Sequence, residues 1–305
     1  MSPCNGSTIV KCISFNARSI FNKLPEWYYL IYACDYDIIF VTETWLSSQT
    51  PSSMLDPQDG FNVIRCDRQS GRGGGVCCLI SKKLRHREIE IPSRFSTLEL
   101  CCLEVCFSRY PFRFFNIYCK PGAGQERVSA MSHLIDCLSQ LFILDGANVI
   151  VGDLNCGDID WVNLNAPGDN IQDTLLNFAI EHGYYQLVSE PTRDTKILDL
   201  LLTNEPLSIC DICINEPFSN SDHNQVMFKV FAESATATSI NNDAVGSTFR
   251  CWREADFDGM CSYLLAINWD HLFSVNFTAE SIWSAFCDIM NTAVEQFVPV
   301  STQSK

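Results

Sequence analysis

Polar side chains recur where apolar, strand-like runs of this 305-residue chain meet loops. The run Val149–Val151 breaks at Gly152 and continues directly into Asp153, Leu154 and Asn155. Other apolar runs break in the same way, at Asn16, Glu43, Tyr118, Asp199 and the pair Asp222 and His223. Together these groups supply oxygen ligands for a hard cation, a base, hydrogen-bond donors and an Asp–His pair. That combination is the chemistry of metal-assisted phosphodiester cleavage.

Each position also has a simpler interpretation. An Asp-x-Asn sequence after a strand is most often a turn or a helix cap. Taken alone, Glu43 is more typical of a solvated loop carboxylate, and Ser221-Asp222-His223 is compatible with a helix N-cap. Asp199 differs from these, because an unpaired charge within the run LDLLL is costly to bury. It needs a partner, and a histidine is a good candidate.

Strand and helix patterns alternate at the start of the chain. The strand pattern Ile9–Phe15 precedes an apolar stripe at helical spacing from Leu24 to Ile31, and the strand pattern Asp37–Thr42 follows. This order predicts the βαβ-like opening of a layered α/β domain, in which strand ends converge on one edge. Further strands are predicted over Phe61–Arg65, Gly75–Ile80, Leu98–Phe107, Arg113–Tyr118, Asn148–Val151, Ile197–Leu202 and Gln225–Phe231, and helices over 127–144 and 173–181.

Composition changes after this region. The segment Ala232–Ser247 is small and polar without an apolar period, which predicts a linker. Two helices are predicted beyond it, over Glu254–Ile267 and Ala279–Phe297, and they are too small to form a substantial core alone.

The order of the motifs SFNARS, TETW, NIYCKPG, VGDLN, LDLLLTN and SDHNQV is specific, although each motif alone is weak. It resembles the endonuclease/exonuclease/phosphatase superfamily, and most closely the apurinic-type endonuclease domain of non-LTR (LINE-type) retrotransposon polyproteins. The resemblance covers about residues 8–231. It implies a four-layer α/β sandwich, with two packed mixed sheets flanked by helices, followed by a C-terminal helical extension.

The resemblance also implies a domain organisation. Residues 1–231 would form the endonuclease/exonuclease/phosphatase domain and residues 232–247 the linker. Residues 248–305 resemble the helical connector that precedes the reverse transcriptase of such elements, and no Ala-Asp-Asp polymerase motif is present here.

The resemblance assigns a metal site to this chain. Glu43, assisted by Asn16, would hold Mg²⁺ against the phosphate, with Asp222 near the metal and Mn²⁺ as a possible substitute. One departure from the pattern is Cys119, which stands where these elements commonly have an arginine. A phosphate contact made by that arginine is therefore in doubt.

The same resemblance assigns the catalytic roles. Asp153 would position or deprotonate the attacking water, while Asn155 and Tyr118 would donate hydrogen bonds to the developing charge. His223 would contact the phosphate and would be oriented by Asp199. Preorganised donors of this kind stabilise a transition state.

These implications lead to the hypothesis of a Mg²⁺-dependent phosphodiesterase, specifically a DNA endonuclease that nicks target DNA for retrotransposition. Its expected partners are DNA and, through a longer polyprotein, element RNA; a monomer is expected. Two alternatives remain open: a phosphatase or phospholipid phosphodiesterase of the same fold, and a catalytically silent retrotransposon-derived binding domain. The net charge of −15 disfavours a simple nucleic-acid binder, yet clustered carboxylates suit a metal-dependent enzyme.

Composition excludes several other classes. Apolar residues make up 47% of the chain and charged residues 19%, which argues against disorder. No apolar stretch is long enough to span a membrane and no signal peptide is evident, so we expect an intracellular protein of the cytoplasm and nucleus. The 17 cysteines are odd in number and lie mostly in apolar runs, as reduced core cysteines do.

Two motifs suggest sites that we reject. Cys210 and Cys213 have the spacing of a zinc half-site, but they lie in a strand-like run and no second ligand pair follows. The glycine run GRGGGV lacks the Gly-Lys-Ser/Thr of a phosphate loop. We interpret it as a tight connection into the strand that begins near Val76.

Overall fold

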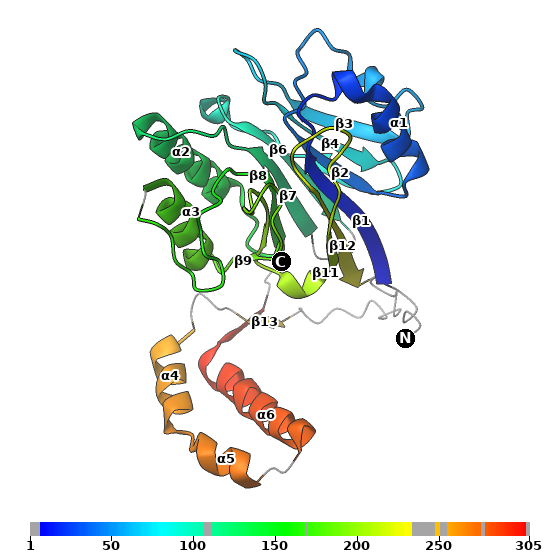
Figure 1. Ribbon diagram of the computed structural model, residues 1–305. Helices are drawn as coiled ribbons and strands as arrows, with labels where there is room; N and C mark the ends of the chain where they lie inside the picture. The colour runs from blue at the N-terminus through cyan, green and yellow to red at the C-terminus, as the bar shows by residue number, and fades with distance from the viewer. Residues whose placement is uncertain are drawn as a thin grey trace. The chain divides into compact units, whose positions relative to one another are not determined.

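The computed structural model describes residues 7–106, 111–168, 170–233, 248–250, 255–275 and 278–302. The chain forms two compact units, Met1–Thr236 and Ala237–Lys305 (Figure 1). Of the predicted linker, Ala232 and Glu233 belong to the last strand of the first unit, and the remainder lies outside the described residues. The domain boundaries therefore stay a prediction.

Two six-stranded mixed sheets form the centre of the first unit. In each, one neighbouring pair is parallel, β1 with β2 and β7 with β8, and the other pairs are antiparallel. The first sheet has the order β11 (Ile209–Asn215), β12 (Gln225–Glu233), β1 (Ser7–Asn16), β2 (Ile38–Thr42), β4 (Val76–Ser81), β3 (Phe61–Cys66). The second has the order β5 (His86–Glu88), β6 (Glu99–Cys106), β7 (Pro111–Tyr118), β8 (Ala147–Asp153), β10 (Asp199–Thr203), β9 (Tyr185–Gln186).

The sheets pack face to face because alternate residues of their strands are apolar on the shared side. In β8, Val149 and Val151 join this inter-sheet core, together with Phe40 and Phe114, whose ring centroids lie 5.5 Å apart. The intervening residue Ile150 points into the core beneath the helices of the other layer. Strands that are buried on both faces thus explain the continuous apolar runs of the sequence.

Helices cover the outer faces of both sheets, as Figure 1 shows. Helix α1 (Leu24–Ala33) buries Trp27, Leu30 and Ile31 on the first sheet. Helices α2 (Gln125–Leu141) and α3 (Asn170–Glu181) pack on the second sheet. The predicted four-layer α/β sandwich is confirmed. Short 3₁₀ turns lie at Phe21–Lys23, Ser52–Met54, Ser93–Phe95 and Pro206–Ser208.

Antiparallel pairing decides which strand ends meet. Because β10 runs antiparallel to β8, its first residue, Asp199, pairs with the last residue of β8, Asp153. Because β12 runs antiparallel to β1, the residues before Gln225 lie near Asn16 at the end of β1. The ends of β1, β2, β7 and β8 and the beginnings of β10 and β12 therefore form one rim.

The second unit contains three helices among its described residues. They are α4 (Phe257–Ala266), α5 (Trp269–Val275) and α6 (Ala279–Phe297), with a small two-stranded sheet of β13 (Thr248–Arg250) and β14 (Val300–Thr302). The predicted C-terminal helices are present, and the short α5 lies between them as an addition. Among the described residues of this part, the buried apolar cluster consists of Met260, Ala293 and Val298.

The rejected cysteine pair lies on the edge strand β11. The pairing of this strand with β12 shifts between Cys210 and Cys213, and both thiols are exposed. This bulge interrupts the regular alternation of side chains along β11. Among the described helices, none combines the length and the hydropathy needed to cross a membrane.

Candidate active site

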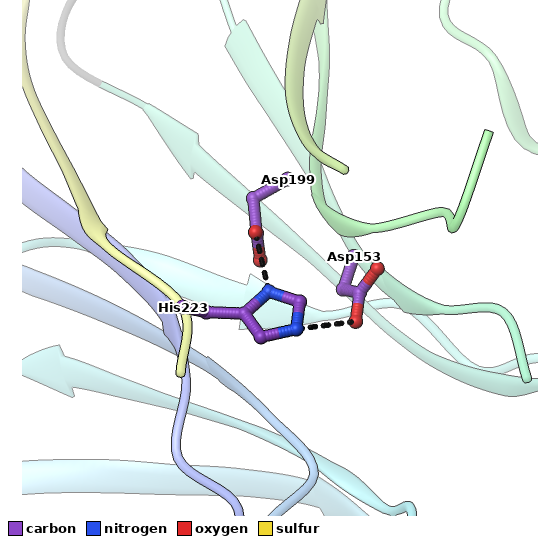
Figure 2. A group of neighbouring side chains, drawn as sticks. All are labelled: Asp153, Asp199 and His223. Carbon is purple, nitrogen blue, oxygen red and sulfur yellow. Dashed lines mark hydrogen bonds and ion pairs between the residues drawn. The ribbon is translucent and has the colours of Figure 1, made fainter. Parts of the chain in front are cut away.

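Three buried side chains meet where the two sheets end, as Figure 2 shows. Nδ1 of His223 lies 2.7 Å from Oδ2 of Asp199, and Nε2 lies 3.9 Å from Oδ2 of Asp153. All three side chains are at most 2% exposed. The structure thus gives the isolated acid Asp199 a histidine partner, and that histidine turns its second nitrogen toward Asp153.

Asp153 is held by two further residues of the predicted site. Asn16 donates from Nδ2 to its Oδ2 at 2.9 Å, and the backbone N–H of Asn155 donates to its Oδ1 at 3.1 Å. Burial raises the pKa of Asp153, and the negative charge of Asp199 raises it further. His223 and the two donors act in the opposite direction, because they favour the charged carboxylate. A carboxyl with a raised pKa can accept a proton near neutral pH, as a general base must.

The pKa of His223 reflects two opposing causes. Burial lowers it, but the hydrogen bond and the charge of Asp199, with smaller contributions from Asp153 and Asp222, raise it above its ordinary value. The proton on Nδ1 is thereby directed to Asp199, and Nε2 is left to face the substrate side. When the ring is charged, Nε2–H is a donor suited to a phosphate oxygen.

The loop after β8 depends on unusual backbone conformations. Gly152 has a φ of 125°, and a Cβ at this position would collide with the carbonyl oxygen of Ile117 on β7. Asn155 has a φ of 51°, and its Nδ2 donates to the carbonyl of Cys119 at 2.9 Å. The sequence GDLN therefore brings the loops after β7 and β8 together, and the second N–H of the Asn155 amide remains for a ligand.

Glu43 and Tyr118 form a more open part of the site. Tyr118 donates from its hydroxyl to Oε1 of Glu43 at 2.7 Å, and Trp45 donates from Nε1 to Oε2 at 3.0 Å. Burial raises the pKa of Tyr118, and the charge of Glu43 raises it further, so the phenol stays a donor. Tyr118 and Asp153 are paired neighbours on β7 and β8, which connects this part with the buried triad.

The glycine run supports this open part. The backbone N–H groups of Thr44 and Trp45 donate to the carbonyls of Gly75 and Gly74 at 3.2 and 2.9 Å. Gly75 has a φ of 81°, and a side chain there would meet the hydroxyl of Thr44. The run is a close connection into β4 that positions the Glu43 loop.

Asp222 directly precedes His223 in the chain, and its carboxylate already forms two ion pairs. Its Oδ2 is 2.9 Å from Nη1 of Arg18 and 2.8 Å from Nη2 of Arg193. A metal ion at Asp222 would compete with both ion pairs.

The chemistry of the donor set fits a hard divalent cation. Asp153, Asp199 and His223 offer ligand atoms that all lie within 4.8 Å of one another. Glu43 accepts one hydrogen bond on each oxygen, which leaves lone pairs on both. Oδ1 of Asp199 is buried without a hydrogen-bond partner among the described residues.

Several residues that position the site were not singled out from the sequence. The hydroxyl of Thr192 accepts the backbone N–H of Asp199 at 3.0 Å, and Ser221 donates from Oγ to the carbonyl of Asn16 at 2.6 Å. Thr192 is fully buried although it lies in the polar stretch PTRD. The Pro-Thr pair at Pro191 and Thr192, in the loop before β10, is the only sequence signal that could have identified it.

Comparisons with known proteins agree with the fold of the first unit. Residues 112–227 match a family model described as endonuclease-reverse transcriptase. The resemblance to the endonuclease/exonuclease/phosphatase superfamily is confirmed. The matched residues run from β7 to β12 and include Tyr118, Asp153, Asn155, Asp199 and His223.

Solved structures show the superfamily's fold over most of the first unit. The endonuclease domain of TRAS1, a telomere-specific non-LTR retrotransposon, is 14% identical and has a TM-score of 0.57; the match covers 73% of this chain and 98% of that one. The AP endonuclease LMAP from Leishmania major is 14% identical with a TM-score of 0.58, covering 74% and 88%. The 3′ phosphatase NExo from Neisseria, bound to a product DNA hairpin, is 14% identical with a TM-score of 0.56, covering 72% and 99%. No curated protein matches the chain.

Proposed function

We propose that this chain is a divalent-metal-dependent phosphodiesterase that nicks DNA, as a target-DNA endonuclease of a non-LTR retrotransposon does. The observation that carries the proposal is the buried arrangement in which Asp199 orients His223 and His223 faces Asp153. Buried ionisable groups with shifted pKa values cluster at functional sites, and Asp153 and His223 both have raised pKa values. The likeness to the TRAS1 endonuclease domain supports DNA as the substrate.

Asp153 is the proposed base of the reaction. It takes a proton from the attacking water, whose oxygen then forms the new bond to phosphorus as the bond to the leaving oxygen breaks. Asn16 and the backbone of Asn155 hold the carboxylate in place for that transfer. The raised pKa of Asp153 brings it toward neutrality, where a base is most effective.

The remaining groups act on the phosphate. His223 donates from Nε2 to a phosphate oxygen, while Asp199 fixes its tautomer and favours its charged form. Tyr118 and the amide of Asn155 donate to charge that develops in the transition state. The His223 ring and the Asn155 amide are held beforehand by Asp199 and by the carbonyl of Cys119, whereas the single O–H of Tyr118 donates to Glu43 and must turn away from it to reach the phosphate.

The metal ligands in this proposal are Glu43 and Asn16, with Asp222 beside them and Mg²⁺ or Mn²⁺ as the ion. When bound, the ion would act as a Lewis acid that neutralises phosphate charge. Glu43 is partly exposed, so an ion can reach it from solution, and its bond to Tyr118 links it to the strand pair that carries Asp153.

The acidic net charge of −15 keeps a second candidate in view, a phosphatase or phospholipid phosphodiesterase of the same fold. The test is nicking of supercoiled plasmid by the full chain in Mg²⁺, with EDTA and with Asp153→Asn as controls. We expect relaxed circles in Mg²⁺ only, and a loss of at least about a hundredfold in Asp153→Asn, on the scale of a lost general base. Cleavage that persists in EDTA would refute the metal mechanism, and hydrolysis of phospholipid without nicking would favour the second candidate.

A further inference from the structure

Two arginines on the loops beside His223 are not used by the proposed reaction. Arg18 follows β1 and Arg193 lies in the turn before β10, and both contact Asp222. We propose that Arg18 and Arg193 bind a second backbone phosphate, adjacent to the one that is cleaved. This inference rests on the proposed function and specifies its substrate class, because a second phosphate is a property of a polynucleotide.

The ion pairs leave most of the hydrogen-bonding capacity of the two arginines unused. Nη1 of Arg18 and Nη2 of Arg193 approach the same oxygen, Oδ2 of Asp222, at 2.9 and 2.8 Å. Each guanidinium has five N–H donors, and their planar arrangement matches two oxygens of a phosphate. Nε of Arg193 also lies 3.8 Å from Asp194, but that side chain is 88% exposed and such a contact is weak in water.

One carboxylate cannot neutralise two guanidinium groups. The arginine side chains are 48% and 40% exposed, so both can reach a ligand. Lys23 adds a buried positive charge next to Arg18, because its Nζ donates to the carbonyl of the preceding residue, Ala17, at 2.5 Å. Burial lowers the pKa of Lys23, and repulsion by Arg18 lowers it further, while the charges of Asp222 and Glu26 raise it.

Both arginines are carried by backbone that is tied to the site itself. Arg193 follows Thr192, whose hydroxyl accepts the N–H of Asp199 and whose carbonyl accepts the N–H of Asn224 at 2.7 Å. The N–H of Arg18 donates to Oδ1 of Asn16 at 3.0 Å. A phosphate bound by these side chains would therefore be held at a fixed distance from Asp199 and from His223, the residue before Asn224.

The local charge also accounts for how an acidic protein can hold DNA. A chain with a net charge of −15 repels a polyanion at long range, so affinity must come from cations placed directly at the site. A substrate with one phosphate would use the Asp153–His223 site alone. A polynucleotide would use both places and would gain binding energy that positions the cleaved bond.

A purely structural function is the competing explanation, because Asp222 with its two arginines joins three loops. The two explanations differ in their effect on DNA affinity and its salt dependence. Each phosphate contact that is lost lowers the slope of log Kd against log salt by about one, whereas a structural ion pair changes folding stability instead.

The experiment compares the full chain with its Arg193→Ala variant by titration of a labelled DNA duplex in EDTA at several salt concentrations. The matched control is Arg87→Ala on β5, an edge strand of the second sheet, whose side chain is 65% exposed and pairs with Glu104 on β6. We expect Arg193→Ala to weaken binding about 3- to 30-fold and to lower the salt slope by about one. The control should change neither quantity.

A second measurement adds turnover of two substrates with Mg²⁺. Arg193→Ala should reduce kcat/KM for plasmid DNA at least about threefold more than for bis(p-nitrophenyl) phosphate, which has a single phosphate. An unchanged salt slope, or equal losses on both substrates, would overturn the second phosphate site. If the wild type nicks no DNA, the proposed function fails, and the salt slope measured in EDTA still decides whether Arg193 binds a phosphate.

Discussion

The two halves of the candidate site differ in their access to solvent. The side chains of the closed half (Asp153, Asp199 and His223) are at most 2% exposed, whereas Glu43 and Asn155 on the neighbouring loops, the open half, are partly exposed. In the closed half, one hydrogen bond joins two ionisable groups, His223 and Asp199. The hydrogen bonds of the open half join a carboxylate or an amide to neutral donors and carbonyls, as in the bond from Tyr118 to Glu43.

This difference in exposure suits the two halves of the site to different roles. Buried charges interact strongly because little water screens them, so the closed half can shift the pKa values of a base and of a histidine. An open carboxylate can exchange its ligands, so Glu43 is suited to a metal ion that arrives from solution. Substitutions in the closed half should therefore change the chemical step, and substitutions in the open half should change the metal requirement.

The largest expected effect tests the closed half as one unit. Asp199→Asn should lower kcat about 10- to 1000-fold, because the Asn side chain no longer favours the charged form of His223. His223→Ala should cost at least as much. The double variant should lose far less than the product of the two losses, because the residues act together.

The measurement is single-turnover nicking at saturating Mg²⁺, with Asp136→Asn on the exposed face of α2 as the matched control. Losses that multiply as independent effects, or a fully active Asp199→Asn, would show that His223 does not act through Asp199. His223 would then need another partner.

A smaller effect is expected from Glu43→Gln in the open half. The substitution keeps the shape and the acceptor for Tyr118 but removes the charge that a cation needs. The Mg²⁺ concentration for half-maximal nicking should rise about 10- to 100-fold, with a smaller fall in kcat at saturation. A Mg²⁺ titration of nicking measures this, and Glu190→Gln at an exposed loop position is its control. An unchanged half-maximal concentration would place the ion elsewhere, for example at Asp153, Asp199 and His223.

The sequence predicted the closed half better than its surroundings. Asp199 was identified by a physical argument that needs no structure, namely that a carboxylate among leucines requires a partner. The strand ends were identifiable because runs such as Val149–Val151 are buried on both faces and must end at the edge of a sheet. The four-layer order followed from the resemblance rather than from periodicity, because a strand buried on both faces has no alternation from which its sheet could be inferred.

The long-range contacts could not be predicted from the sequence. Arg18 and Arg193 meet at Asp222 only because β12 and β10 run antiparallel to β1 and β8, and local sequence does not specify pairing direction. The strands β5 and β9 contain three and two residues, too few to show a period. Trp45 was visible within the TETW motif, but its bond to Glu43 depends on the turn between them.

The smallest expected effect is on stability, and it tests whether the closed half is costly to the fold. Asp153 and His223 both have raised pKa values in the folded state. A group with a raised folded pKa stabilises the protein fully below its unfolded pKa, and this contribution is lost as the pH rises through the folded pKa. Without metal, the protein should therefore lose stability as the pH rises from about 5.5 to about 8.5.

The variant Asp153→Asn cannot ionise at this position. At the alkaline end of the range its free energy of unfolding should therefore exceed that of the wild type by about 1 to 2 kcal/mol, and its melting temperature should be higher. The stability of the variant should also depend less on pH than that of the wild type. Thermal melts in EDTA across this range, with Asp136→Asn as the control, measure both quantities. A variant that melts at or below the wild type at about pH 8.5 would mean that Asn16, Asn155 and His223 fully compensate the buried charge of Asp153 without any bound cation.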